Sequence, residues 1–179
     1  AYSPLFSPDG TKLAYFDNQN INVLDLATGE TTLVEDNSDW WSLSWSPDSR
    51  AVAFLSYNDG PGDLYSYTLA TQGRVRVTNL GTENLYYPVW SADGSKILFD
   101  LYDNTTGEDS LGIVAAYTQG SVKYLKEHLS VWSLERTASG AIVYVDNQTL
   151  NKFRLEGTFE FKDIQLDAGE NVFSAIAAD

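Results

Sequence analysis

The chain has 179 residues, of which 43% are hydrophobic and 13% aromatic, so it can bury a sizeable core and is not disordered. Its 25 acidic against 11 basic side chains give a net charge of −14, which argues against nucleic acid as a partner because phosphate binding relies on clustered Lys and Arg. Because cysteine is absent, disulfides, iron–sulfur clusters and Cys-ligated zinc are excluded. No apolar run approaches the ~20 residues needed to span a bilayer, so we expect no membrane insertion.

One short phrase recurs along the chain at a nearly constant interval. Its copies are Ser7-Pro8-Asp9-Gly10, Ser46-Pro47-Asp48-Ser49, Ser91-Ala92-Asp93-Gly94, a degenerate Thr137-Ala138-Ser139-Gly140 and a terminal Ala177-Ala178-Asp179. The third position of each copy follows the previous one by 39, 45, 46 and 40 residues. That interval is about the length of one four-stranded propeller blade, so the sequence predicts a repeat architecture.

The first unit predicts four short strands, at about 2–6, 12–17, 20–26 and 31–35. The phrase forms a tight turn between the first two strands, in which Pro8 presets φ, Asp9 accepts a local backbone hydrogen bond and Gly10 tolerates a positive φ. The turn-motif aspartates Asp9, Asp48 and Asp93 are therefore expected to be structural residues, not metal ligands. A polar outer strand ends the unit, as suits a sheet edge exposed to water.

The later units repeat this order. Their third strands show partial period-2 alternation and lie at 63–69, 111–117 and 152–155. No window carries apolar residues with helical spacing over three turns, and the nearest candidate, 122–129, fits an outer strand plus a loop equally well. The fourth unit departs from the template, with Arg136 where the others carry an aromatic residue and Ser139 in place of aspartate. We expect its first turn to be irregular.

Two stretches carry a specific resemblance, residues 2–15 and 87–99, which both run through the turn phrase into an apolar second strand. They resemble the WD-like propeller repeat of TolB-type proteins, and related blades build the propeller domains of prolyl-oligopeptidase-type peptidases. The resemblance implies an all-β chain, a β-propeller of four-stranded antiparallel blades. The expected blades are approximately 1–38, 39–82, 83–128 and 129–169, followed by an extra first strand at 170–179.

The position within a blade at which the sequence opens and closes indicates the size of the ring. The chain opens inside a first strand and closes with a strand that would begin a fifth blade, and open blade edges are prone to pairing. We expect a piece of a larger ring of about six to eight blades, whose uncovered edges allow self-association. A closed four-bladed ring, or two such halves assembling, is the alternative.

The sequence offers little catalytic chemistry. His128 is the single histidine, so a site built on two or three histidines cannot form, and there is no Gly-x-Ser-x-Gly elbow, cysteine nucleophile or phosphate-binding glycine loop. The acidic loops 58–63 and 103–109 are the best candidates for calcium, but neither matches EF-hand spacing and both are expected to be solvated. We predict no catalytic residue, no metal and no cofactor, and no enzyme activity for this chain.

A ligand site is predicted at the start of the first strands, because those strands lie nearest a propeller's axis and the loops leading into them ring one mouth of the channel. The mouth is expected at 38–41, 83–87 and 127–130. The candidate ligand-binding residues are Trp40, Trp41, Tyr86, Tyr87, His128 and Trp132. The alternative is that aromatic rings recurring in register fill the wedges between blades, and that His128 is an ordinary surface residue in a loop. The recurrent aromatic residues stand seven positions before the third residue of the turn phrase and are Tyr2, Trp41, Tyr86 and Trp132. Trp40 and Tyr87 do not occupy this position and are the expected exposed pair.

The resemblance implies two classes of function. The first is a non-catalytic interaction module, similar to TolB-type proteins, that recognises a protein or peptide, or a glycan, at the channel mouth. The second is the accessory propeller of a secreted or periplasmic serine peptidase whose catalytic domain lies outside this sequence. A propeller lyase, similar to oligogalacturonate lyases, is disfavoured because such metal sites use several histidines. In both main classes the expected location is the periplasm or the cell surface.

Overall fold

The computed structural model describes residues 2–18, 20–36, 38–60, 62–80, 84–129, 131–137, 139–146, 149–153 and 164–165. These residues form sixteen strands with connecting turns, and no helix occurs among them. Consequently the described part of the chain holds no helical segment able to cross a membrane. The strands group into four antiparallel sheets of four consecutive strands each, so every connection within a sheet is a hairpin.

Each sheet is one blade, numbered in chain order. Blade 1 contains β1 (Tyr2–Phe6), β2 (Lys12–Asp17), β3 (Asn20–Asp25) and β4 (Thr31–Glu35). Blade 2 contains β5 (Ser38–Trp45), β6 (Ala51–Ser56), β7 (Asp63–Thr68) and β8 (Gly73–Arg76). Blade 3 contains β9 (Asn84–Trp90), β10 (Lys96–Asp103), β11 (Glu108–Ala115) and β12 (Lys123–Leu129). Blade 4 contains β13 (Val131–Arg136), β14 (Ile142–Asp146), β15 (Thr149–Phe153) and β16 (Ile164–Gln165).

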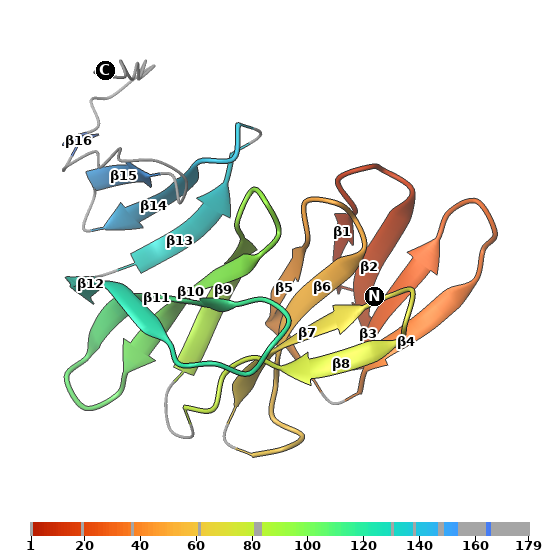
Figure 1. Ribbon diagram of the computed structural model, residues 1–179, viewed down its shortest axis with the longest axis horizontal. Coiled ribbons are helices and arrows are strands. Elements are labelled where there is room, and N and C mark those ends of the chain that lie inside the picture. The colour runs from red at the N-terminus through yellow and green to blue at the C-terminus, as the bar shows by residue number, and fades with distance from the viewer. Residues whose placement is uncertain are drawn as a thin grey trace.

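The four blades are arranged as a β-propeller. Their first strands β1, β5, β9 and β13 face a common centre, and the later strands of each blade lie farther out (Figure 1). Contacts between first strands run from β1 to β5, from β5 to β9 and from β9 to β13. The predicted all-β propeller is therefore confirmed. The blade limits drawn from the sequence stay predictions, and the extra strand expected at 170–179 lies outside the described residues.

The predicted strands of the first unit agree with the structure to within one residue. β3 ends at Asp25, one residue earlier than expected, because the Asp25 carboxylate accepts backbone N–H bonds from Ala27 and Thr28 at 2.9 and 3.1 Å. A carboxylate that binds the backbone two residues later closes a turn at that point.

The three segments expected to be loops at the channel mouth lie largely in strands instead, and residues 84–87 belong to β9. Residues 38–41 belong to β5, because Ser38 pairs with Ser56 of β6. Residues 126–129, including His128, belong to β12, because Leu129 pairs with Asp109 of β11. In β5 and β12 the strand continues past a shift in register, so extra residues are taken up in the strand without ending it.

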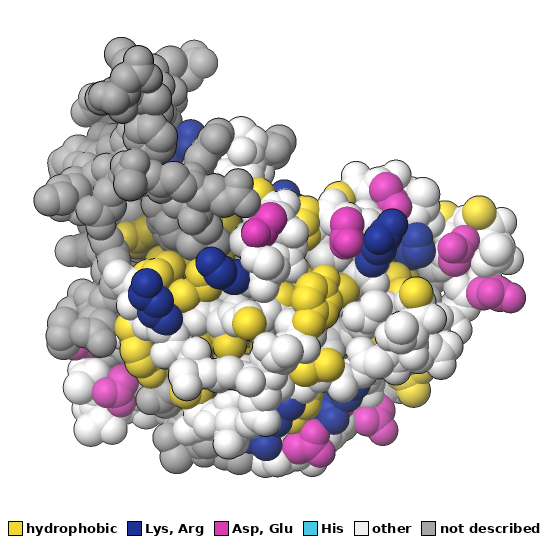
Figure 2. Space-filling view, viewed as in Figure 1, with side chains coloured by type: hydrophobic (Ala, Val, Ile, Leu, Met, Phe, Trp, Pro, Cys, Tyr) yellow, Lys and Arg dark blue, Asp and Glu magenta, His cyan; other side chains and the backbone are white. Residues whose placement is uncertain are grey.

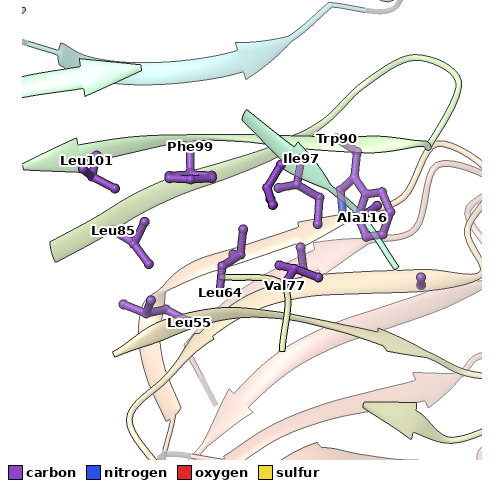
Figure 3. Packing of buried hydrophobic residues seen from close by; sticks show 12 residues of the cluster. Leu55, Leu64, Val77, Leu85, Trp90, Ile97, Phe99, Leu101 and Ala116 are labelled. Atoms are coloured by element: carbon purple, nitrogen blue, oxygen red, sulfur yellow. The ribbon is translucent and has the colours of Figure 1, made fainter. Parts of the chain in front are cut away.

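The wedges between blades are filled by side chains that alternate along each strand. In β10, Ile97 and Phe99 join the core shared with blade 2, whereas Leu98 joins the core shared with blade 4. Figure 3 shows the first of these cores, where Leu55 and Leu64 of blade 2 lie opposite side chains of blade 3. Each fully buried side chain of this size stabilises the fold by about 1.5–3 kcal/mol, so the blades are held chiefly by these wedges.

Two indoles add a directional contact between neighbouring first strands. Trp45 donates its Nε1–H to the carbonyl of Leu5 in blade 1 at 2.9 Å. Trp90 donates in the same way to the carbonyl of Ser44 in blade 2 at 3.1 Å. Leu5 directly precedes Phe6, and Ser44 directly precedes Trp45. The same contact therefore occurs at equivalent positions of successive blades.

The repeated phrase forms the same turn in blades 1, 2 and 3. The first serine of each turn bonds the backbone across it, from Ser7 N to Lys12 O, from Ser46 N to Ala51 O and from Ser91 N to Lys96 O. In blade 4 the matching bond joins Thr137 N to Ala141 O, so that turn is one residue shorter. The irregularity expected from Ser139 is thus a shortened turn.

A cluster of polar and charged groups joins the outer parts of blades 1 and 2. Glu35 of β4 is buried, and its carboxylate forms an ion pair with Arg74 Nε of β8 at 2.7 Å. Ser56 and Asn58 also donate to this carboxylate. The Arg74 guanidinium lies 3.8 Å from the centre of the Tyr65 ring as well. Arg74 lies on the outer strand of blade 2 and links two blades.

Candidate functional site

A cavity of about 330 Å³ lies where the four first strands converge. Every blade contributes to its walls. The lining residues are Leu5, Phe6 and Pro8 of blade 1, Leu43, Ser44 and Trp45 of blade 2, Tyr87, Pro88 and Val89 of blade 3, and Leu134, Glu135 and Arg136 of blade 4. Its volume is at the lower end of the range for small-ligand pockets, and it has the mixture of apolar walls and a few polar groups that such pockets show.

The cavity lies toward the turn end of the first strands, not toward the mouth predicted from the sequence. Its walls include residues one or two positions before the turn phrase in all four blades. Of the six predicted ligand-binding residues, the cavity lining includes Tyr87. The backbones of Trp40 and Trp41 lie in β5, that of His128 in β12 and that of Trp132 in β13, but their side chains lie outside the described residues. Their proposed roles stay predictions.

Tyr86 and Tyr87 adjoin a bulge in β9. Val89 pairs with Leu98 of β10, and Tyr86 pairs with Asp100. Three residue steps along β9 therefore face two residue steps along β10. Within this bulge Tyr87 has φ of 50°, a conformation that costs a bulky residue of order 1–3 kcal/mol. Its ring is 39% exposed and lies 6.3 Å from the Tyr86 ring. Bulges re-aim side chains near functional sites, and here the result is an exposed ring on the cavity wall.

Sequence analysis did not select Phe6, Trp45 or Arg136 as ligand-binding residues, although all three line the cavity. The signal was present, because Phe6, Trp45, Trp90 and Arg136 occupy the same position relative to the turn phrase. Trp45 and Trp90 are buried between blades, whereas Phe6 is 62% exposed. This position thus fills a wedge in blades 2 and 3, and it also contributes to the cavity wall in blades 1, 2 and 4.

Arg136 brings a positive charge to the cavity wall. It is partly buried, and among the described residues its guanidinium has no hydrogen-bond or ion-pair partner. Its neighbour Glu135 also lines the cavity and is exposed. Among the described residues, no ion pair joins Glu135 to Arg136. Arg136 is therefore available to a ligand.

The turn-motif aspartates are occupied by their own turns. The Asp9 carboxylate accepts hydrogen bonds from Ser7 Oγ at 2.6 Å and from Thr11 N at 3.0 Å, and these bonds hold the pKa of Asp9 well below its usual range. Asp93 makes the same bonds with Ser91 and Ser95, which lower its pKa to about 2. Asp48 accepts from Ser46 Oγ and Arg50 N at 2.6 and 3.1 Å.

The acidic loops weighed for calcium are also engaged by protein donors. Asp59 accepts from the Tyr65 hydroxyl and from Arg74, and Asp63 accepts from Thr78 Oγ1 and from Arg76. In the loop after β10, the Asp103 carboxylate accepts from Thr105 N at 2.7 Å. In the described part of the chain, no three acidic or histidine side chains come together in a group able to hold a metal ion.

One buried acid stands apart from these networks. Asp100 of β10 is only 2% exposed, and its Oδ1 has no hydrogen-bond partner. Burial, with the charge of Asp109 as a second cause, raises its pKa to about 8. Seven residues after the turn aspartate, blades 1 and 2 carry Phe16 and Leu55 where blade 3 carries Asp100. A carboxyl thus occupies a wedge position that is apolar elsewhere.

Charge is unevenly distributed over the surface. Figure 2 shows hydrophobic side chains across the middle of the visible face and acidic side chains mainly toward its edge. At the turn end, each of the first three turns pairs one acid with one base: Asp9 with Lys12, Asp48 with Arg50 and Asp93 with Lys96. The turns of a strongly acidic chain are therefore locally balanced, and Arg136 lies beside them.

Radially stacked four-stranded blades around an axial cavity define the chain as a β-propeller domain, a scaffold that carries many different functions. The chain belongs to the family described as the dipeptidyl peptidase IV (DPP IV) N-terminal region, which matches residues 1–160. The resemblance to TolB-type and peptidase propellers expected from the repeats is thus confirmed.

Individual relatives come from both groups. The chain is 34% identical over 89 residues, 44% of its length, to dipeptidyl-peptidase 5 of Porphyromonas gingivalis, and 36% identical over 72 residues, 40% of its length, to the Tol-Pal system protein TolB of Alcanivorax borkumensis. These matches cover only 13% and 16% of those relatives. The crystal structure of Porphyromonas gingivalis dipeptidyl peptidase 4 superposes with a TM-score of 0.68 at 16% identity, covering 92% of this chain and 32% of that one. That likeness shows the fold alone.

Proposed function

We propose that this propeller domain is a non-catalytic binding module that recognises a peptide or a peptide segment of a partner protein at the axis. The observation that carries the proposal is the cavity to which all four first strands contribute. Side chains from four separate blades converge there, as binding residues converge in pockets where structural elements meet.

The exposed rings on its wall support recognition of a peptide. Phe6 is 62% exposed and Tyr87 is 39% exposed, and each lies on a first strand anchored by its blade. Aromatic residues on rigid elements dominate the binding energy of many interfaces. The ring of Tyr87 is also held in place by a bulge rather than by a loose loop. We also propose that Trp40 and Trp41, the mouth residues at the other end of β5, bind part of the same ligand.

The chain's relatives suggest two settings for such a module. As in the TolB relative, it can act as a propeller without a catalytic domain; as in the peptidase relatives, it can be the accessory propeller of a longer enzyme. We favour the binding module, because the four blades of this chain by themselves build a cavity at the axis. In both settings we propose a location outside the cytoplasm, in the periplasm or at the cell surface.

The test is to select peptides from a random displayed library on the 179-residue chain and to measure their affinities for variants by fluorescence anisotropy. Phe6→Ala and Tyr87→Asn remove the two exposed rings; asparagine tolerates the positive φ at position 87. Tyr124→Ala is the matched control, because Tyr124 is 40% exposed but lies on the outer strand β12 of the same blade.

We expect both cavity substitutions to weaken binding at least tenfold and the control to leave it within twofold, on the pattern of interface hot spots. If Tyr124→Ala weakens binding while Phe6→Ala and Tyr87→Asn do not, the outer surface is the binding site. If no selected peptide binds the chain in solution, the proposed function is wrong.

A further inference from the structure

The position of Arg136 in the repeat is the starting point. In blades 1, 2 and 3 the residue just before the turn phrase is Phe6, Trp45 or Trp90, and in blade 4 it is Arg136. Arg136 thus takes a place that two other blades use for an indole packed in a wedge. Arg136 lines the axial cavity, as Phe6 and Trp45 do, but it brings a positive charge there.

We propose that Arg136 binds the C-terminal carboxylate of a peptide whose last residue is apolar, with the apolar side chain seated against Phe6 and Tyr87. This inference rests on the proposed function and names the ligand chemistry of the same cavity. The ligand class is a free peptide C-terminus.

The charge of Arg136 supports an anionic ligand group. A partly buried guanidinium loses hydration, and a partner carboxylate restores the lost interaction through two parallel charge-assisted hydrogen bonds. The other guanidiniums near buried acids are already used: Arg74 is bonded to Glu35 and Asp59, and Arg76 to Asp63. Within the described residues, Arg136 has no such partner.

The inner edges of the first strands do not favour recognition by strand addition. Pro4 in β1 and Pro88 in β9 lack an N–H group to donate. The carbonyls of Leu5 and Ser44 already accept the indole N–H groups of the following blades. A ligand at the axis is therefore recognised mainly by side chains, and the guanidinium is the strongest donor among those that line the cavity.

The size and walls of the cavity favour a chain end over an internal acidic residue. In a C-terminal residue the carboxylate and the side chain leave the same Cα, so a cavity of about 330 Å³ takes both together. An internal Asp or Glu would bring polar peptide groups on both sides against Leu134, Val89 and Tyr87. Those groups would lose their water without gaining partners, which costs free energy.

The test uses three probes on the 179-residue chain: Ac-Ala-Ala-Phe-OH, its amide Ac-Ala-Ala-Phe-NH2, and Ac-Ala-Glu-Ala-NH2 with an internal carboxylate. Affinities are measured by isothermal titration calorimetry at low salt. The variants are Arg136→Gln and, as a control that removes the same charge from a neighbouring turn, Arg50→Gln. Arg50 is exposed and is not part of the cavity lining.

We expect the free acid to bind about ten- to a hundredfold more tightly than the amide, the range for a charge-assisted hydrogen bond. Arg136→Gln should remove that preference, whereas Arg50→Gln should keep it. The peptide with internal glutamate should bind no more tightly than the amide. The comparison of acid with amide uses the unmodified chain, so it stands even if Arg136→Gln lowers the stability of the fold.

Each contrary result has a distinct meaning. Equal binding of acid and amide overturns the carboxylate site but leaves peptide binding at the axis intact. An acid preference that persists in Arg136→Gln shows that another residue binds the carboxylate. Equal binding of the internal-glutamate peptide shows that the carboxylate comes from a side chain instead of a chain end. If none of the probes, and no library peptide, binds below millimolar concentration, both the inference and the proposed function fail.

Discussion

The buried acid at position 100 makes the stability of the domain depend on pH in an unusual direction. Its pKa rises from 3.8 to about 8 on folding, because burial disfavours the charged form. A folded-state pKa above the unfolded value means that the folded state holds the proton more tightly. Stability from this group is therefore complete below about pH 4 and is lost as pH rises toward 8.

The magnitude follows from the pKa difference. One pKa unit corresponds to about 1.36 kcal/mol, so raising the pH from 4 to 7 removes roughly 4 kcal/mol from the free energy of unfolding through this residue. Asp100→Asn has nearly the same shape and no charge. It should unfold at higher free energy than the parent at pH 7, by up to about 4 kcal/mol, with burial of its amide reducing the gain. Near pH 4 the two proteins should be equally stable.

Urea unfolding at one-unit steps between pH 4 and 8 measures the effect. The difference between Asp100→Asn and the parent should widen with pH by about 1.4 kcal/mol per unit. Asp103→Asn is the control on the same strand, because hydrogen bonds from Thr105 and Thr106 lower the pKa of Asp103 and its effect has the opposite sign. Parallel pH profiles for the parent and Asp100→Asn would refute the reasoning.

Four further outcomes can be checked. Asp48→Ala should cost about 0.5–2 kcal/mol in urea unfolding if Asp48 caps its turn as an N-cap residue caps a helix, and an unchanged midpoint would reject that role. Gly112→Ala should destabilise the chain by about 1–3 kcal/mol, because its Cβ would stand 2.7 Å from the Phe99 ring, whereas Gly120→Ala, with 3.9 Å to its nearest neighbour, should cost less; equal losses would contradict this. Arg74→Ala should cost about 1–3 kcal/mol because it leaves the buried Glu35 carboxylate without its cation, and Arg74→Lys should recover part of the loss; a neutral Arg74→Ala would show that the ion pair contributes nothing. The chain alone should release no 4-nitroaniline from dipeptidyl 4-nitroanilides, and release abolished by a serine-directed inhibitor would show that it is an enzyme.

The strands were predictable because the repeat constrains every unit at once. A turn phrase followed by a β-branched and aromatic run occurs four times. Aligning the units on Asp48 and Asp93 therefore also locates strands whose own sequence pattern is weak. That the fourth turn is irregular could likewise be anticipated from Ser139, because the carboxylate that caps the other turns is missing there, but its shortening by one residue could not.

The mouth of the channel was harder to predict because bulges do not interrupt a hydrophobic pattern. The run around Trp40 reads as a loop, yet β5 begins at Ser38 and takes up the extra residues within the strand. The conformation of Tyr87 depends on how β9 pairs with β10, which no local pattern specifies. The sequence named Tyr87 but did not predict a cavity at the turn end of the first strands, and the ligand site expected at the mouth stays a prediction.

Contacts between blades depend on geometry that lies beyond a single repeat. The pairing of Glu35 with Arg74 joins outer strands of different blades, and the pattern within one repeat does not indicate it. Asp100 could have been found by comparing units position by position, because Phe16 and Leu55 show that its site is apolar in the other blades. Its burial is a property of the wedge, which exists only once two blades are packed.

The indole contacts between blades have a fixed order along the chain, and therefore a fixed order during synthesis. In each case the donor belongs to the later blade and the acceptor to the earlier one, from Trp45 to Leu5 and from Trp90 to Ser44. During synthesis at about 5–20 residues per second, each blade emerges some seconds before the next. The carbonyl that a new indole needs is therefore already fixed in a finished strand. Growth from the ribosome extends the propeller one blade at a time, and the carbonyls of Leu5 and Ser44 receive their indole donors only when the next blade has been made.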